Sequence, residues 1–397
     1  MKQALYISDF GLVNALGNDN KTIKANLLAG SQAGLSRRSD LLLEGDITVA
    51  GVKSELPSLA DKAKHLRSRN NQLALAALSQ IKTQALALIN QYGKSRIAIV
   101  MGTSTSGISD GESAMAELQQ QGEFPGHYHY SQQEIYNTAE FIAQELGTCG
   151  VCFTISTACS SSAKAFKTAQ ELIDSDMADA AIVGGVDSIC AMTINGFHAL
   201  SSTSQGICQP SSANRDGINI GEAAAIAIVS KQPSRVKLLA VGESSDAHHM
   251  SAPHPEGEGA VAAMQSALAQ AKFAATDVDY VNLHGTATPK NDAMEALAID
   301  KVFGRQTPCS STKGMHGHTL GAAGATEVGL CWLLLGGDDN QDNYHYAPHI
   351  WDQVVDDSMP VLNLTTLGQR KPSPIRSCLS NSFAFGGNNV SVLLGLS

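Results

Sequence analysis

Residues 151–166, VCFTISTACSSSAKAF, decide the fold class: a run of β-formers, a turn of small residues, and a helix-like segment that opens beside Cys159. A turn between a strand and a helix pushes its residues outward, and the unpaired N–H groups of the first helical turn favour negative charge there. A thiol at such a position ionises more easily, and the thiolate is the nucleophile. Most cysteines are instead buried structural residues, so this segment alone leaves both interpretations of Cys159 open.

The rest of the chain repeats the alternation of strand and helix. Expected strands cover residues 96–101, 151–156, 180–183, 223–229, 236–242, 280–283 and 390–394, and expected helices cover residues 71–92, 162–175, 259–272, 292–303 and 319–335. This alternation predicts α/β layers with parallel or mixed sheets. A turn at Pro233 and Ser234 is the best boundary between two halves, residues 1–235 and 236–397.

Composition excludes several classes of protein. With 397 residues, 43% of them hydrophobic and only 16% charged, the chain is long enough for two domains or one large duplicated one. The net charge of −10 argues against nucleic acid or an anionic membrane as the general partner. We expect a cytoplasmic protein, because no apolar run approaches the length of a membrane span and the N-terminus lacks a signal-peptide pattern.

Eight cysteines scattered along the chain are typical of reduced thiols in a reducing compartment. Cys149 and Cys152 have the spacing CxxC, but no second pair and no nearby pair of histidines accompanies them. Metal or redox chemistry at this pair is therefore the less favoured interpretation.

Two further segments end a strand in a cluster of reactive side chains. In residues 278–292, VDYVNLHGTATPKND, a β-rich run stops at His284, and in residues 310–324, SSTKGMHGHTLGAAG, Lys313 comes five residues before His318. A lone histidine at a strand end is more often structural than catalytic. Strands that run alike bring their ends to one edge of a layered sheet, so we expect these residues to meet Cys159.

Such a group could form a carbon–carbon bond. A cysteine thiolate can take an acyl group as a thioester, and two histidines can hold the oxygen of an enolate derived from a second thioester. A cysteine protease needs one histidine and an orienting amide or acid, and has little use for Lys313 and a second histidine. The residues alone favour acyl transfer over thiol-dependent hydrolysis only modestly.

Four segments in this order, TACSSSAKAF, HGTATPKND, KGMHGHTLGAAGATE and NSFAFGGNN, resemble the motifs of the β-ketoacyl-acyl carrier protein synthases, in the class with one cysteine and two histidines. The resemblance implies the thiolase fold, with two similar αβ halves in five layers and usually a dimer. It also implies a decarboxylating condensation of a Cys-bound acyl group with malonyl-acyl carrier protein, which extends a fatty acyl or polyene chain by two carbons. No metal, nucleotide or redox cofactor is expected, because the substrates are carried on phosphopantetheine.

The same resemblance implies a role for each motif residue. Cys159 is the acylated nucleophile, and His284 and His318 activate the malonyl thioester and hold its enolate. Lys313 orients the site and balances its charge, with Glu295 as the expected partner, since a buried charge is costly unless it is paired.

Phe385 matches the aromatic residue of the family's gating loop, and the glycines that follow it allow that loop to move. Its backbone N–H and that of Cys159 form the expected oxyanion hole. The remaining matches are Thr286 and Thr288, which bind pantetheine, and Asp246 and Glu327, which with Glu295 belong to the network around the site.

Several positions depart from the common pattern of elongating enzymes, among them Asn388, which replaces the usual threonine. Ala384 replaces the glycine before Phe385, and Thr105 stands where the resemblance implies a residue lining the acyl pocket. A polar lining favours an acyl chain that is not simply long and saturated. These variants are similar to the specialised ketosynthases of aryl polyene clusters, some of which form heterodimers with a chain-length factor. Chain length, unsaturation and the choice between homodimer and heterodimer stay open.

The densest basic cluster is residues 61–70, DKAKHLRSRN, with Lys62, Lys64, Arg67 and Arg69. Most charge runs are simply solvated helix faces. Here the resemblance implies the docking surface for an acidic acyl carrier protein.

Two other functions remain as alternatives. The chain could be a partner subunit like a chain-length factor, with weak or no condensing activity of its own, or it could be an acyl-thioester hydrolase. The intact set of Cys159, His284, Lys313 and His318 argues against the first.

Overall fold

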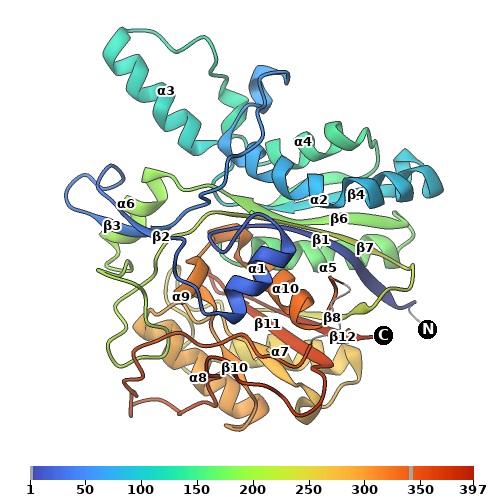
Figure 1. Ribbon diagram of the computed structural model, residues 1–397, viewed down its shortest axis with the longest axis vertical. Helices are drawn as coiled ribbons and strands as arrows, with labels where there is room; N and C mark the ends of the chain where they lie inside the picture. The colour runs from blue at the N-terminus through green and yellow to red at the C-terminus, as the bar shows by residue number, and fades with distance from the viewer. Residues whose placement is uncertain (1–2, 339–342) are drawn as a thin grey trace.

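The computed structural model describes residues 3–338 and 343–397, and ten of the strands in these ranges form two topologically equivalent groups of five (Figure 1). In the first group the order is β5-β4-β6-β7-β1, and in the second it is β10-β9-β11-β12-β8. In each group the first three strands are parallel and the last two join antiparallel. The strands are β1 (Leu5–Val13), β4 (Ile97–Gly102), β5 (Cys152–Ile155), β6 (Ala180–Asp187), β7 (Ala223–Ser230), β8 (Val236–Ser245), β9 (Tyr280–Asn282), β10 (Cys309–Ser310), β11 (Ser377–Phe383) and β12 (Asn388–Leu396).

A short antiparallel ladder between β1 and β8 joins the two groups, and a separate hairpin pairs β2 (Leu35–Arg38) with β3 (Ile47–Ala50). The duplicated order makes β5 the counterpart of β10, and β4 the counterpart of β9. The chain segments after these strands therefore emerge at equivalent places in the two halves.

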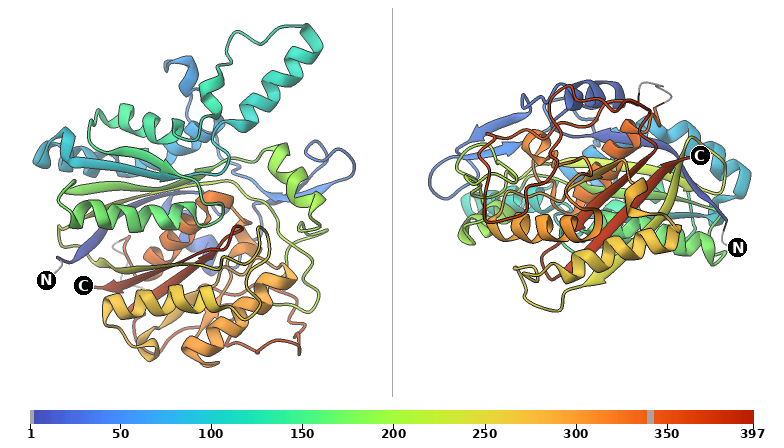
Figure 2. Two further views of the ribbon diagram at one scale, coloured as in Figure 1. Left: turned by 180° about the vertical axis from the view of Figure 1, so that it is seen from behind. Right: turned by 90° about the horizontal axis from the view of Figure 1, so that it is seen from below.

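Helices cover both sheets and fill the space between them, which gives the five predicted layers (Figures 1 and 2). Helices α2 and α4 cover one outer face, α5 and α10 lie between the sheets, and α7 and α8 cover the other outer face. The helices are α1 (Asn20–Leu28), α2 (Arg69–Tyr92), α3 (Ile108–Gln121), α4 (Asn137–Leu146), α5 (Ser161–Asp174), α6 (Ala191–Ala199), α7 (Glu258–Ala271), α8 (Pro289–Phe303), α9 (Lys313–His316) and α10 (Ala323–Leu334). The predicted α/β class is confirmed.

The two central helices place the site because they pack backbone against backbone. In α5 the buried residues Ala165, Phe166, Ala169 and Ile173 recur at helical spacing and give it an apolar face. Every residue of α10 is buried. A Cβ added at Gly324 would lie 2.6 Å from the Cβ of Ala163, so only glycine lets α10 approach α5 this closely.

The predicted strands and helices agree with the structure to within a few residues, except that a 3-10 turn, η5 (Leu320–Ala322), precedes α10. No helix in the two described ranges combines the length and the apolarity that crossing a bilayer requires.

Candidate active site

Cys159 lies in the turn between β5 and α5, where the preceding Ala158 adopts a left-handed φ of 52°. The side chain is 5% exposed. Burial raises the pKa of the Cys159 thiol to about 11, although Lys313 and the backbone N–H groups of Phe385 and Cys159 favour the thiolate. The sequence-based expectation of an easily ionised thiol is therefore wrong for the free protein, because desolvation outweighs the helix terminus.

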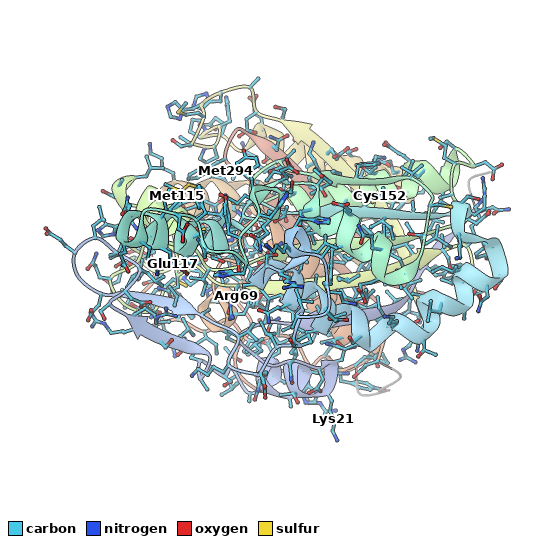
Figure 3. All side chains as sticks on the ribbon, turned by 90° about the horizontal axis from the view of Figure 1, so that it is seen from above. Lys21, Arg69, Met115, Glu117, Cys152 and Met294 are labelled. Atoms are coloured by element: carbon cyan, nitrogen blue, oxygen red, sulfur yellow. The ribbon has the colours of Figure 1, made fainter. Side chains whose placement is uncertain are left out.

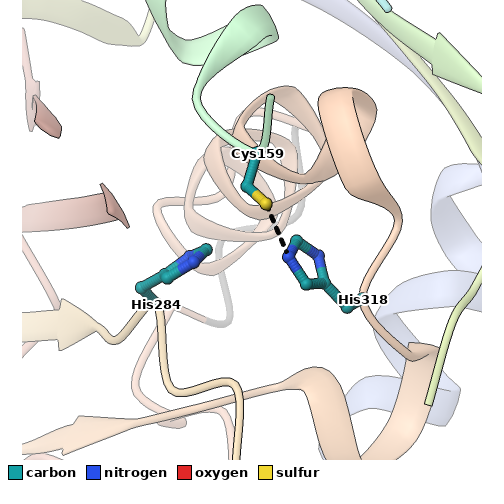
Figure 4. A group of neighbouring side chains, drawn as sticks. All are labelled: Cys159, His284 and His318. Atoms are coloured by element: carbon teal, nitrogen blue, oxygen red, sulfur yellow. Dashed lines mark hydrogen bonds between the residues drawn. The ribbon is translucent and has the colours of Figure 1, made fainter. Parts of the chain in front are cut away.

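His284 and His318 converge on this thiol from the other half of the molecule (Figure 4). The Nε2 atom of His318 lies 3.0 Å from the Sγ atom of Cys159. The rings of the two histidines are 5.4 Å apart, centroid to centroid, at an interplanar angle of 87°. Burial, followed by the charge of Lys313, holds the pKa of each histidine well below its usual value, so both are neutral at pH 7.

The partner predicted for Lys313 is wrong. Its ammonium group donates a hydrogen bond to Glu327 on α10, and the two side chains are 1% and 0% exposed. Glu295 on α8 instead accepts hydrogen bonds from the backbone N–H groups of His284 and Gly285, each at 2.7 Å. The reason is that α8 runs back past the turn after β9, so the Glu295 carboxylate meets that turn and not the lysine.

Burial raises the pKa of Glu327 to about 7, and Lys313 opposes this shift. Burial also raises the pKa of Glu295 to about 7, opposed by the hydrogen bonds from Gly285 and His284. In both acids the hydrogen-bond partners favour the ionised form and burial favours the protonated form. Each supports one residue of the site: Glu327 fixes Lys313, and Glu295 fixes the backbone of His284.

A cavity of about 280 Å³ opens beside the thiol. The hydroxyl groups of Thr286 and Thr288 are 2.9 Å apart and hydrogen-bonded to each other. Both threonines lie on the cavity wall, where they could contact the arm of a carrier-bound substrate. The sequence-predicted residues that line the cavity are Cys159, His284, His318, Phe385, Asp246, Thr286 and Thr288.

The loop of Phe385 lines the cavity and is held by contacts on two sides. The ring of Phe385 packs against Phe197 of α6 at 5.5 Å between centroids, and Gly386 and Gly387 follow it with left-handed φ angles. Asp246 donates its backbone N–H to the carbonyl oxygen of Gly387 at 2.9 Å and accepts a 2.7 Å hydrogen bond from the Asn389 side chain. Asp246 therefore fastens the loop of Phe385, and its part in a network around the catalytic residues stays a prediction. Phe197 was missed, because its helix carries no recognisable motif.

Thr105 does not line this cavity, contrary to the expectation. It is 0% exposed, and its hydroxyl donates a 2.7 Å hydrogen bond to the carboxylate of Asp187. A threonine whose hydroxyl is already bonded inside the core presents no polar group to an acyl chain there. Asp187 was also missed; its only signal in the sequence is a polar residue at the end of a buried strand.

The basic segment is a 3-10 turn, η1 (Lys64–Leu66), followed by the start of α2, and its four cations differ in accessibility. Lys64 is exposed, whereas Lys62 lies 2.6 Å from a carboxylate oxygen of Glu145. Arg67 is half-buried and donates to a backbone oxygen. The guanidinium of Arg69 is held by the buried carboxylate of Glu222 at 2.5 and 2.8 Å while its side chain stays 39% exposed, and its part in docking stays a prediction.

Cys149 and Cys152 are both exposed free thiols. In the part of the chain that the structure describes, the one group of three His, Cys, Asp or Glu side chains close enough to share a metal ion is Cys159, His284 and His318. The CxxC pair has no third candidate ligand near it among those residues, and its role stays open.

Two family models match consecutive parts of the chain. Residues 15–234 match "Beta-ketoacyl synthase, N-terminal domain", and residues 236–345 match "Beta-ketoacyl synthase, C-terminal domain". Together they cover most of the sequence, including the cysteine and both histidines. The division proposed at residue 235 stays a prediction.

Curated and solved relatives agree with the family models. The 3-oxoacyl-[acyl-carrier-protein] synthase 1 of Haemophilus influenzae is 30% identical, over 98% of this chain and 97% of the relative. The 3-oxoacyl-[acyl-carrier-protein] synthase 2 of Staphylococcus aureus is also 30% identical, over 96% of this chain and 98% of the relative. The ketosynthase ApeO from Xenorhabdus doucetiae, solved in complex with its chain length factor ApeC, is 45% identical with a TM-score of 0.94, and the match covers 100% of this chain and 98% of that one. These matches confirm the resemblance seen in the motifs and the thiolase-like fold class.

Proposed function

The chain belongs to the β-ketoacyl synthase family of acyltransferases, and on that premise we propose that it condenses an acyl group on Cys159 with malonyl-acyl carrier protein. The observation that carries this assignment of residues is the convergence of Cys159, His284 and His318 on one buried point, with His318 Nε2 3.0 Å from the thiol sulfur. Two neutral histidines facing one thiol are suited to a condensation and exceed what hydrolysis needs.

In the first half-reaction the sulfur of Cys159 attacks the thioester carbonyl of acyl-carrier protein. A carbon–sulfur bond to Cys159 forms, the bond to the pantetheine sulfur breaks, and the thiol proton ends on the departing pantetheine. Because burial raises the pKa of the thiol to about 11, the proton must leave during the attack, and His318 is placed to receive it. The N–H groups of Cys159 and Phe385 stabilise the oxyanion.

In the second half-reaction malonyl-carrier protein loses carbon dioxide, and the electron pair of the broken bond forms an enolate. Each neutral imidazole carries one N–H, and in the tautomer that places this proton on Nε2, which His318 adopts once Cys159 is acylated and carries no proton, His284 and His318 can each donate a hydrogen bond to the enolate oxygen. The enolate carbon attacks the acyl thioester, Cys159 leaves as a thiolate, and the thiolate takes up one proton. The product is a β-ketoacyl chain two carbons longer. The chemistry uses no metal, nucleotide or redox cofactor, and we place the protein in the cytoplasm.

The partners follow from the same assignment. Acyl carrier protein delivers both substrates, and the exposed Lys64 with the half-buried Arg67 is the proposed docking surface. We propose a heterodimer with a chain-length factor, as in the ApeO complex, in preference to a homodimer. Two features support a partner chain: β5 is an edge strand that pairs on one side with β4 and begins with the exposed Cys152, and Met115 on α3 is 47% exposed (Figure 3 labels both residues).

The proposed acyl substrate is a polyene chain of the aryl polyene type. The support is the 45% identity to ApeO together with the departures in the gating loop, where Ala384 precedes Phe385. Thr105 gives no support to a polyene substrate, because its hydroxyl is bonded to Asp187.

The test is a Cys159→Ala variant of the purified complex, supplied with acyl- and malonyl-carrier proteins. Formation of the elongated β-ketoacyl product must disappear, whereas decarboxylation of malonyl-carrier protein persists because both histidines remain. Cys149→Ala, which removes an exposed thiol, is the matched control and should condense normally.

The same experiment separates the alternatives. Free acid released without elongation by the unmodified protein indicates a hydrolase. In an active ketosynthase iodoacetamide should label Cys159 selectively, and the ketosynthase inhibitor cerulenin should block this labelling. A subunit with a vestigial site would show neither condensation nor this selective labelling. Condensation by the alanine variant would show that the nucleophile is wrongly assigned.

A further inference from the structure

Asp187, at the end of β6, is a fully buried carboxylate that the proposed reaction does not use. Its Oδ1 atom accepts hydrogen bonds from the hydroxyl of Thr103 at 2.8 Å, the backbone N–H of Ser104 at 2.8 Å, and both the N–H and the hydroxyl of Thr105 at 2.7 Å. Its Oδ2 atom accepts a 2.8 Å hydrogen bond from the backbone N–H of Ala322. One carboxylate therefore connects the loop after β4 with the turn that precedes α10.

Both connected segments are strained. Ser106 in the first and Leu320 in the second adopt left-handed φ angles of 46° and 51°, which non-glycine residues hold only where the surroundings fix them. The segments also touch at Asp187: a Cβ added at Gly321 would lie 2.8 Å from Asp187 Oδ2 and 2.7 Å from the Ser104 hydroxyl. The carboxylate of Asp187 therefore lies between the loop after β4 and the turn before α10, and its hydrogen bonds help to hold both in their strained conformations.

The second segment carries a residue of the site. His318 is two residues before Leu320 and four before Ala322, and its Nε2 atom contacts Cys159. The backbone of His318 is held from the other direction by a 2.7 Å hydrogen bond from its N–H to the carbonyl oxygen of Asn219. The carbonyl oxygen of His318 accepts a 2.9 Å hydrogen bond from the N–H of Gly221, so residues 219–221 hold the His318 backbone itself. The bond from the N–H of Ala322 to Asp187 then fixes the turn that leads from His318 into α10.

We propose that Asp187 is a positioning residue: its carboxylate ties the loop after β4 to the turn that carries His318 and so holds the Nε2 atom of His318 against the Sγ atom of Cys159. This inference rests on the proposed function, because it gives Asp187 a part in maintaining the condensing site.

An Asp187→Asn substitution tests the link because it keeps the shape and changes one acceptor into a donor. An amide whose NH₂ replaces Oδ1 would face four donors, whereas an NH₂ that replaces Oδ2 faces only the N–H of Ala322. The second orientation costs less, so the substitution breaks the bond to Ala322 and releases the turn of His318.

The substitution also removes a negative charge close to the nucleophile. The charge of Asp187 raises the pKa of Cys159, although burial is the largest cause and Lys313 opposes both. The other titratable groups facing the thiol, His284 and His318, are neutral. The variant should therefore condense more slowly, although its Cys159 thiol ionises more easily. Loss of folded protein would slow condensation but would not make the thiol easier to ionise.

The experiment compares wild type and Asp187→Asn in the intact complex with its partner subunit. We expect condensation to fall about 10- to 100-fold, and the pH profile of iodoacetamide labelling of Cys159 to move to lower pH. Asp292→Asn is the matched control, since Asp292 is also a fully buried carboxylate that accepts from backbone N–H groups, those of Ser211 and Ala287. It should lower thermal stability without moving the labelling profile.

Thr105→Val provides a second, milder variant that removes one hydroxyl donor and keeps the charge. It should slow condensation several-fold and leave the labelling profile in place. If folded Asp187→Asn condenses at the wild-type rate, the positioning role is overturned. Where Asp187→Asn does not fold, a wild-type rate in folded Thr105→Val overturns that role instead. Either result leaves the proposed function intact. Absence of Cys159-dependent condensation in the wild type instead overturns the proposed function.

Discussion

The ammonium group of Lys313 is bonded to the carboxylate of Glu327, and this pair lies fully inside the protein beside the two histidines. The lysine charge lowers the pKa of His284, His318 and Cys159 alike, in each case as the cause second to burial. The charge of Lys313 therefore adds to burial in keeping both histidines neutral, and it offsets part of the desolvation of the thiol.

Replacing Lys313 by methionine should destabilise the protein and raise the pKa of Cys159 further. Breaking a buried pair leaves Glu327 without its partner, which costs about 3–5 kcal/mol. Thermal unfolding should move to lower temperature, and iodoacetamide labelling of Cys159 should require a higher pH. The double variant Lys313→Met with Glu327→Leu is the control: it should recover stability but not the labelling profile. A labelling profile unchanged in Lys313→Met contradicts the role of the lysine charge.

Glu295→Gln should impair the malonyl half-reaction more than acylation. The carboxylate accepts two backbone hydrogen bonds, from His284 and Gly285, and an amide can accept only one of them. The turn that carries His284 then shifts, while Cys159 and His318 keep their contact. We expect malonyl decarboxylation to fall about 10-fold or more, with transfer of the acyl group to Cys159 nearly unchanged. If the rates of acyl transfer and of malonyl decarboxylation, measured separately, fall by the same factor, Glu295 does not act on the malonyl half-reaction alone.

His349 should make the folded state sensitive to acid. Its Nδ1 atom accepts from the N–H of Ser311 and its Nε2 donates to the carbonyl oxygen of Pro210, so the folded protein holds the neutral ring, and burial lowers its pKa to about 4. The unfolded chain binds a proton near pH 6.5. Stability is therefore full above pH 6.5 and is lost as pH falls through that value toward 4, by about 3 kcal/mol for this group.

Urea unfolding of wild type and His349→Gln between pH 7 and pH 4 measures this loss. The wild type should lose more free energy of unfolding than the variant over this range. The comparison cancels the opposite contribution of Glu295 and Glu327, whose raised pKa values of about 7 favour the folded state as pH falls. Parallel pH profiles would show that the ring is not held neutral by the fold.

Lys64→Glu should weaken docking of the acidic carrier protein at low salt, since Lys64 is exposed. We expect KM for acyl-carrier protein to rise several-fold, with iodoacetamide labelling of Cys159 unchanged. Lys21→Glu reverses the charge of another exposed lysine and is the control, for which KM should be unchanged. Arg69→Glu should act differently, by breaking the pair with Glu222 and lowering stability. Equal KM values for Lys64→Glu and wild type at low salt place docking elsewhere.

The sequence was most informative where a strand ends in a reactive residue. The turns at Cys159, His284 and His318 could be located from strand-like runs followed by small residues, and their convergence follows from parallel strands in a duplicated sheet. The partner of Lys313 could not be predicted, because Glu295 and Glu327 both lie on neighbouring helices and only the packing of α10 selects one. Likewise, the sequence does not show whether the side chain of Thr105 lines a cavity or is hydrogen-bonded to Asp187.

The most direct test of the central claim is intact-protein and peptide mass spectrometry of the complex after incubation with acyl-carrier protein, before and after malonyl-carrier protein is added. We expect the acyl mass on the peptide that contains Cys159, followed by its loss as a β-ketoacyl-carrier protein two carbons longer appears. An acyl group on another residue, or one that malonyl-carrier protein does not remove by elongation, contradicts the account.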